Sequence, residues 1–307
     1  MIAQAVLAEL AAELALYAAA ALWLAQVHGV PLWTSAVLAL ALFLCLRAGL
    51  LALLYVRAGI GAGFFRFLPG ELRALLDIYT WGLLAHRRLA PRDPARIAPG
   101  VLPVVFVHGI LCNAGVWHRM LAALERQGMT NLFTLNLAPP LASMDRFARQ
   151  LAARVEEACR AAGTERAIIV AHSMGGLVAR CWIARLGGAA RAERLVTLGS
   201  PHHGSLLARG FPARWAGEML CGCEWLEQLA AYGARAVGVD GARAVGVPVT
   251  SIYSRADEFV APQESSRLEG ARNIALERLG HLELLRSEEV LRLVGAEIAS
   301  ARGGRLS

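Results

Sequence analysis

The chain has 307 residues, of which 56% are hydrophobic, and it carries a formal net charge of +7 at pH 7. This length is enough for one large core and an additional segment. Every strongly basic residue is an arginine, and no arginine-rich run is interleaved with aromatic side chains, so we expect no nucleic-acid partner.

Two long apolar segments precede residue 60. They are Ile2–Val27 and Leu32–Val56, and His28-Gly29-Val30-Pro31 separates them. At about 1.5 Å per residue, each is long enough to cross a hydrocarbon core of roughly 30 Å. No basic region precedes the first segment, as a secretory signal peptide would require. The pattern favours a transmembrane helical hairpin over residues 1–58, with a single anchor or signal sequence and a pair of buried soluble helices as the alternatives.

Charged residues inside the two segments are consistent with this hairpin. Folding the chain about residues 29 and 30 brings Glu13 beside Arg47, roughly 25 Å along each helix from the turn. An arginine can reach the interface there and pair with the glutamate. Arginines follow the second segment, whereas the turn has none. The positive-inside rule therefore predicts that both ends of the chain lie in the cytoplasm.

Residues 59–100 are expected to connect the hairpin to a second domain. The glycine-rich stretch 59–65 resembles a flexible exit from a bilayer. Residues 71–86 have the pattern of an amphipathic helix that can lie on a membrane. The stretch 87–100, rich in proline and arginine, marks the domain boundary.

From residue 103 onward, strand and helix patterns alternate. The predicted strands are Pro103–Val107, Asn131–Leu137, Ala167–Ala171, Arg194–Leu198, Pro248–Tyr253 and Arg272–Leu276. Helical patterns occupy about 115–127, 144–162 and 175–187. This alternation predicts an α/β fold in which a mostly parallel sheet has helices on both faces. In such sheets, sites form at the carboxyl ends of the strands.

The third predicted strand runs into Ala171-His172-Ser173-Met174-Gly175-Gly176. A strand, a sharp turn carrying a serine and a following helix make up a nucleophile elbow. Such a turn exposes the serine hydroxyl and directs the next backbone N–H, that of Met174, toward a substrate oxygen. Because a serine hydroxyl is a weak nucleophile, it needs a base within hydrogen-bond reach.

Four strings together resemble bacterial triacylglycerol lipases and esterases of the α/β-hydrolase superfamily. They are V-F-V-H-G-I at 105–110, A-H-S-M-G-G at 171–176, T-L-G-S-P-H-H-G-S at 197–205 and the late pair Asp257 … Gly280-His281. The resemblance covers about residues 101–295, and Ala171 stands where the commonest pattern has glycine. It implies an α/β-hydrolase fold over 101–307, with a small helical cap at about 205–247.

The resemblance also implies the roles of the site residues. Ser173 would be the nucleophile, His281 the base and Asp257 the acid that orients it, with Glu258 as the rival acid. The second oxyanion donor would be the backbone N–H of Ile110, alongside that of Met174. No cofactor and no metal are expected.

The cap supplies candidate substrate contacts in Trp215, Met219 and Trp225. These apolar side chains could face an acyl chain or could pack the cap onto the domain. The adjacent His202 and His203 are expected to form a structural turn, because neighbouring side chains diverge and no further ligands cluster near them. The six cysteines have no paired spacing, which is typical of free thiols in a reducing compartment.

The sequence therefore predicts a membrane-anchored serine hydrolase that cleaves carboxylic esters, with a lipid acyl ester as the expected substrate and the bilayer as a partner. The expected place is the bacterial inner membrane, with the catalytic domain in the cytoplasm. The alternatives are a serine acyltransferase or thioesterase of the same fold, and a non-catalytic membrane scaffold.

Overall fold

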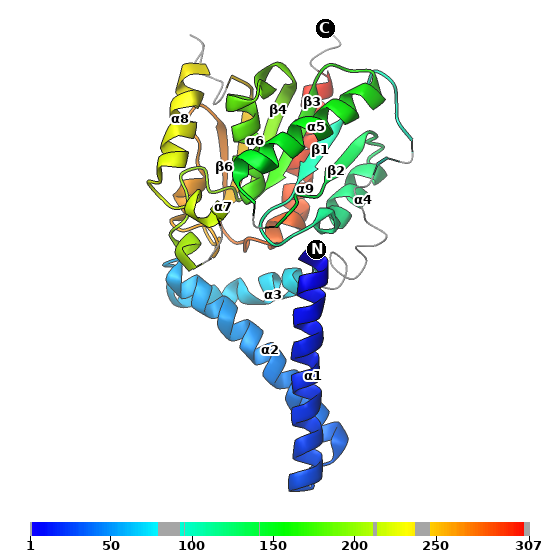
Figure 1. Cartoon of the computed structure of the whole chain (residues 1–307), viewed down its shortest axis with the longest axis vertical. Helices are drawn as coiled ribbons and strands as arrows, with labels where there is room; N and C mark the ends of the chain where they lie inside the picture. The colour runs from blue at the N-terminus through cyan, green and yellow to red at the C-terminus, as the bar shows by residue number, and fades with distance from the viewer. Residues whose placement is uncertain are drawn as a thin grey trace.

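The computed structural model describes residues 2–78, 93–94, 96–140, 142–210, 214–236 and 246–303. A parallel sheet lies between two layers of helices, and a helical hairpin projects from one end of it (Figure 1). The sheet and the helices around it, within residues 101–303, are called the sheet domain below.

All six predicted strands are present, with small shifts at their ends. They are β1 (Val104–Val107), β2 (Leu132–Leu135), β3 (Ala167–His172), β4 (Ala192–Leu198), β5 (Val249–Ser254) and β6 (Arg272–Leu276). Their order in the sheet is β2-β1-β3-β4-β5-β6, and every neighbouring pair is parallel. All carboxyl ends therefore lie at one edge, where the sequence predicts the site.

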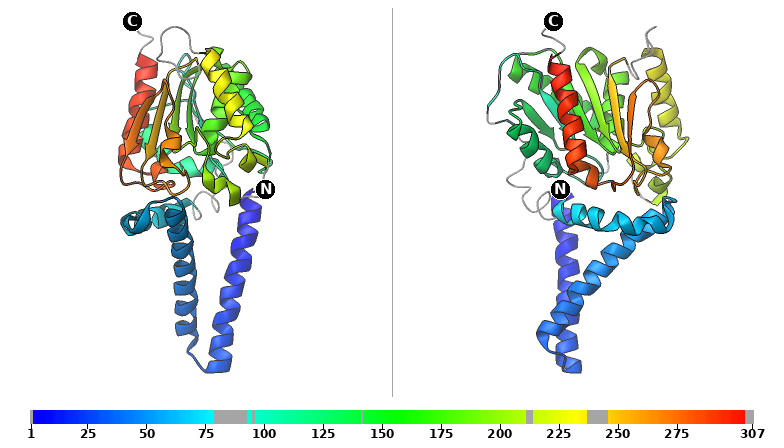
Figure 2. Two further views of the ribbon diagram at one scale, coloured as in Figure 1. Left: turned by 90° about the vertical axis from the view of Figure 1, so that its left-hand side faces the viewer. Right: turned by 180° about the vertical axis from the view of Figure 1, so that it is seen from behind.

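Helices cover both faces of the sheet (Figure 2). One face carries α5 (Met144–Ala162), α6 (Met174–Arg185) and α8 (Glu224–Ala236), and the other carries α4 (His118–Arg126) and α9 (Glu288–Gly303). Helix α9 is not among the predicted elements. The connections contain short helices: η4 (Ala114–Trp117), η5 (Gly188–Ala190), η6 (Leu206–Gly210), α7 (Arg214–Gly217), η7 (Gln263–Ser266) and η8 (Glu283–Leu285).

Because side chains alternate along a strand, the strands contribute side chains to two separate hydrophobic cores, one on each face of the sheet. Val105 and Val107 of β1 belong to the core under α5 and α6. Val104 and Phe106 belong to the core under α4 and α9. All four side chains are fully buried, which explains why β1 is apolar without interruption.

The hairpin consists of α1 (Ile2–His28) and α2 (Leu32–Arg57), and its turn lies far from the sheet domain (Figure 2). The predicted contact between Glu13 and Arg47 is confirmed as an ion pair that joins the two helices. In the part of the chain that the structure describes, α2 alone is long and apolar enough to cross a membrane, and α1 has a shorter apolar stretch, Ala15–His28.

After the hairpin, η1 (Gly61–Arg66) leads to α3 (Leu68–Asp77), which crosses the base of the sheet domain (Figure 1). The predicted amphipathic helix 71–86 thus begins earlier, and residues 79–92 lie outside the described residues. Ala74 and Ile78 are buried in the same core as Phe106. The apolar face of α3 is therefore covered by the sheet domain rather than left free for a membrane surface.

Candidate active site

Ser173 lies in the turn between β3 and α6, with φ 56° and ψ −129°. A positive φ is strained for a residue with a side chain, and such strain is common at functional sites. The two glycines that follow allow the turn to sit close to the sheet. A Cβ on Gly175 would lie 2.5 Å from the carbonyl oxygen of Val107, and one on Gly176 would collide with Ser200.

Asp257 and His281 meet at the same edge of the sheet. Asp257 follows β5, His281 follows β6, and the Nδ1–H of His281 donates to Oδ2 of Asp257 at 2.7 Å. The other carboxylate oxygen of Asp257 accepts the backbone N–H groups of Phe259 and Val260, each at 2.9 Å. With Nδ1 bound in this way, Nε2 of the neutral ring is left as the proton acceptor.

The surroundings of His281 also set its basicity. Burial lowers the pKa of His281. The charge of Asp257 and its hydrogen bond raise this pKa by more than burial lowers it, and Glu71 adds to the increase. The net effect is a pKa above the ordinary histidine value. Such an imidazole accepts a proton readily and holds it while a negative partner stays in place.

His172 connects the serine turn to His281. The two imidazole rings pack with their centroids 4.6 Å apart, and His172 Nε2–H donates to the carbonyl oxygen of His281 at 3.2 Å. The sequence predicts only that this side chain points away from the serine hydroxyl. Between the described residues Ser173 and His281 there is no direct hydrogen bond, and such bonds often tighten only when substrate binds.

His108 orients the predicted oxyanion loop. Its Nε2 accepts the Leu137 N–H at 3.1 Å, so Nδ1 carries the proton and donates to the carbonyl oxygen of Gly109 at 2.8 Å. Burial lowers the pKa of His108 to about 4, which keeps the ring neutral. Because the two ends of a trans peptide point in opposite directions, this bond turns the Ile110 N–H away from the ring.

Space for that peptide beside the serine depends on Gly109. A Cβ on Gly109 would lie only 2.7 Å from Cβ of Ser173. Among the described residues, no hydrogen bond uses the N–H of Ile110 or of Met174. Both predicted donors are therefore available to a ligand oxygen.

The three candidate substrate contacts lie in the cap. Trp215 and Met219 belong to the core under α6, and the indole N–H of Trp215 donates to the carbonyl oxygen of Pro140 at 3.2 Å. The guanidinium of Arg185 lies over the ring of Trp225, 5.2 Å from its centroid. These contacts attach the cap to the domain. Of the two roles expected for these side chains, they show the packing of the cap. A contact with an acyl chain stays a prediction.

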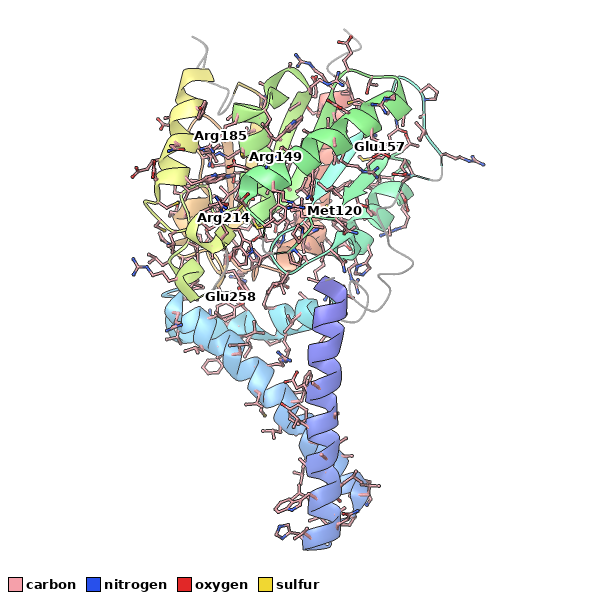
Figure 3. The ribbon with its side chains drawn as sticks, in the orientation of Figure 1. Met120, Arg149, Glu157, Arg185, Arg214 and Glu258 are labelled. Carbon is pink, nitrogen blue, oxygen red and sulfur yellow. The ribbon has the colours of Figure 1, made fainter. Side chains whose placement is uncertain are left out.

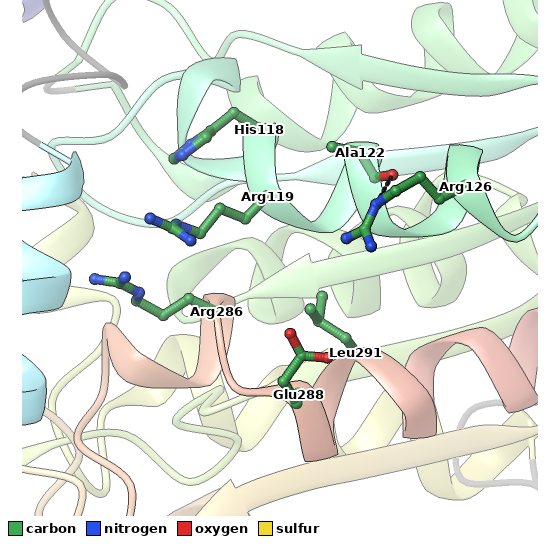
Figure 4. A pocket seen from close by; sticks show the side chains of 7 residues that line it. All are labelled: His118, Arg119, Ala122, Arg126, Arg286, Glu288 and Leu291. Atoms are coloured by element: carbon green, nitrogen blue, oxygen red, sulfur yellow. Dashed lines mark hydrogen bonds between the residues drawn. The ribbon is translucent and has the colours of Figure 1, made fainter.

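A cavity of about 400 Å³ lies elsewhere, between α4 and the start of α9 (Figure 4). Its lining includes His118, Arg119 and Arg126 of α4, and Arg286 and Glu288 near α9. It does not include the serine turn. Across the described part of the chain, no cluster of three or more His, Cys, Asp or Glu side chains could hold a metal ion.

Comparison with known proteins agrees with this architecture. Residues 103–234 match the family model of palmitoyl protein thioesterase. Bacillus licheniformis lipase BlEst2 in its mature form superposes with a TM-score of 0.57 at 18% identity, over 68% of this chain and 96% of that one. Aspergillus fumigatus lipase B gives 0.57 at 18% identity, over 69% of this chain but only 56% of the lipase.

The chain has the α/β-hydrolase fold. The expectation of a mostly parallel sheet with helices on both faces is thereby confirmed, and the sheet domain, which has this fold, is called the hydrolase domain below. The expected enzyme class, a carboxylic ester hydrolase, is the class to which these matches belong. Ser173 follows β3, Asp257 follows β5 and His281 follows β6, so all three come after the carboxyl ends of parallel strands.

Proposed function

We propose that the protein is a membrane-anchored serine hydrolase that cleaves carboxylic esters, and lipid acyl esters in particular. The observation that carries this proposal is the Asp257–His281 pair at the sheet edge where the strained Ser173 turn also lies. The matches to lipases and to a thioesterase family model support it.

The reaction proceeds through an acyl-enzyme. Ser173 Oγ attacks the ester carbonyl carbon while His281 Nε2 takes its proton, and Asp257 stabilises the imidazolium. The backbone N–H groups of Ile110 and Met174 stabilise the negative oxygen of the tetrahedral intermediate. His281 then gives the proton to the departing alcohol. Water repeats the sequence on the acyl group and regenerates the Ser173 hydroxyl.

The position of the site favours a lipid substrate. The loops that carry Asp257 and His281 contact the segment that follows the hairpin, through Gln263 and Ala58 on one side and through Glu71 on the other. If α1 and α2 cross a bilayer, this edge of the hydrolase domain faces the membrane surface. An acyl ester can then reach Ser173 without leaving the interface.

Activity-based labelling tests the proposal. A fluorophosphonate should label the full-length protein at Ser173, and p-nitrophenyl esters should be hydrolysed. Ser173→Ala should abolish both. Ser200→Ala is a matched control, because Ser200 is also buried after a parallel strand and its hydroxyl has no described partner. Absence of labelling and of hydrolysis in the folded protein, with wild type and Ser173→Ala alike, would exclude the enzyme function and favour the non-catalytic scaffold.

A thioesterase is the second candidate, because the matched family model is that of palmitoyl protein thioesterase. The discriminating measurement is kcat/KM for a thioester and an oxygen ester of the same acyl chain. A strong preference for the thioester would assign the thioesterase activity. Formation of a new ester in the presence of an added alcohol would instead indicate an acyltransferase.

A further inference from the structure

The loop that carries His281 is bound by carboxyl groups from two other parts of the chain. The backbone N–H groups of Leu282 and Glu283 donate to the two oxygens of Glu71, at 2.8 and 3.0 Å. The N–H of His281 itself donates to Oε2 of Glu258 at 3.1 Å. These N–H groups lead into η8 and have no partners within that helix, so external acceptors satisfy them.

Glu71 comes from α3, in the segment that connects the hairpin to the hydrolase domain. Its side chain is completely buried, as is that of Glu258. The two buried carboxyl groups interact electrostatically with each other. Burial first, and then the neighbouring Glu258, raises the pKa of Glu71 well above its ordinary value. Burial and the charge of Asp257 raise the pKa of Glu258 to about 7.

The residue before His281 leaves room for this contact. A Cβ on Gly280 would collide with the Glu71 carboxyl group and would lie 2.9 Å from the hydroxyl of Tyr55. Tyr55, near the end of α2, is completely buried. The hairpin exit and the His281 loop thus fit together closely, and Figure 3 shows Glu258 at the base of the hydrolase domain where they meet.

Gln263 links the loop of Asp257 to the segment that follows the hairpin. The side-chain amide of Gln263 donates to the carbonyl oxygen of Ala58, just after α2, at 3.1 Å. The same nitrogen donates to the carbonyl oxygen of Asp257 at 3.0 Å. The loops of both Asp257 and His281 therefore contact the segment that leaves the hairpin.

We propose that Glu71 is a positioning residue for His281, and that the segment joining the hairpin to the hydrolase domain is a component of the active site. This inference rests on the proposed role of His281 as the base. Glu71 touches no substrate in this proposal. It fixes the backbone from which the imidazole projects, and a displacement of about 1 Å in such a group can lower a rate by about 10²-fold.

The test compares full-length variants in the same detergent. Glu71→Ala removes the acceptor of two N–H groups, so kcat and the rate of fluorophosphonate labelling should fall at least about 10-fold. KM should change little, because the substrate contacts are intact. Glu71→Gln should recover part of the lost activity, since its amide oxygen still accepts one of the two N–H groups.

Asp77→Asn is the matched control on the same helix. Asp77 joins α3 to Arg119 of α4 at 2.7 and 3.0 Å. It should leave kcat within about twofold. If Asp77→Asn lowers kcat as much as Glu71→Ala does, general loosening of α3 explains the loss and the positioning role is wrong.

Hydrogen–deuterium exchange of residues 279–286 provides a readout that does not require activity. Glu71→Ala should accelerate exchange at Leu282 and Glu283, also in a Ser173→Ala background. Unchanged exchange, or faster exchange with normal kcat, overturns the positioning role. Failure of the proposed function gives a different result, in which Ser173→Ala is as active as the wild type while the exchange protection by Glu71 persists.

Discussion

The proposed base, His281, is buried and has partners from four places in the chain. Asp257 binds its ring, His172 its carbonyl oxygen, Glu258 its N–H, and Glu71 the two N–H groups that follow. The ring and the backbone are thus fixed separately. Such a base needs little rearrangement when substrate arrives, which lowers the entropic part of the barrier.

The pH dependence of activity follows from the raised pKa of His281. The base works when it is neutral, so kcat/KM should fall as the pH decreases through that pKa. Asp257→Asn removes the charge that raises it, so the acidic limb should move to lower pH, and kcat should fall by about 10³–10⁴. Measurement of kcat/KM against pH checks this. An acidic limb that stays in place would contradict the role of Asp257, and Asp145→Asn, on the surface, serves as the control.

At the residue scale, the sequence predicted the groups that carry short motifs. Ser173 has the strand–turn–helix pattern, and Asp257 and His281 follow late strands whose carboxyl ends must share one edge. Glu71 could not be predicted in this way. It is one acidic residue on an amphipathic helix, and its partner Leu282 is 211 positions away.

At the scale of elements, the apolar pattern predicted an element well where only one kind of surface can bury its apolar side chains. Strands β1, β2 and β3 are mostly apolar because both of their faces are buried, whereas β6 is partly exposed, and all six strands were predicted. For α3 the pattern was ambiguous, since the same apolar stripe suits a membrane surface and a protein core. Ala74 and Ile78 pack into the hydrolase domain, a choice that depends on tertiary contacts.

The hairpin offers a prediction about paired charges. Arg47→Leu leaves Glu13 without its ion-pair partner, so the hairpin should lose about 1–3 kcal/mol of stability. The double variant Glu13→Leu/Arg47→Leu should recover it, because no charge is then left without a partner. Thermal unfolding in detergent measures both effects. A hairpin that becomes more stable or inserts better with Arg47→Leu alone would show that the pair is not stabilising.

At the scale of the whole molecule, the hairpin and the hydrolase domain share one junction. Helix α3 lies between them (Figure 1), the His281 loop contacts α3 through Glu71, and Gln263 contacts Ala58, just after α2. The turn of the hairpin lies at the opposite end from the hydrolase domain (Figure 2). A bilayer around α1 and α2 would therefore hold the carboxyl edge of the sheet close to the lipid headgroups.

The orientation in the membrane can be tested with C-terminal fusions in a bacterial host. The excess of arginine after α2 predicts that the hydrolase domain stays in the cytoplasm. A fluorescent protein at the C-terminus should fluoresce, and an alkaline phosphatase, which needs export, should be inactive. The reverse pattern would put the hydrolase domain on the other side and reject the predicted topology.

The contact between Glu71 and Leu282 also has a consequence for biosynthesis. Because chains are made from the N-terminus, the helices of the hairpin leave the ribosome before the His281 loop does. The loop then docks on a helix that was synthesised 211 positions earlier. Under the proposed function, the hairpin and α3 are therefore synthesised before the active site can be completed.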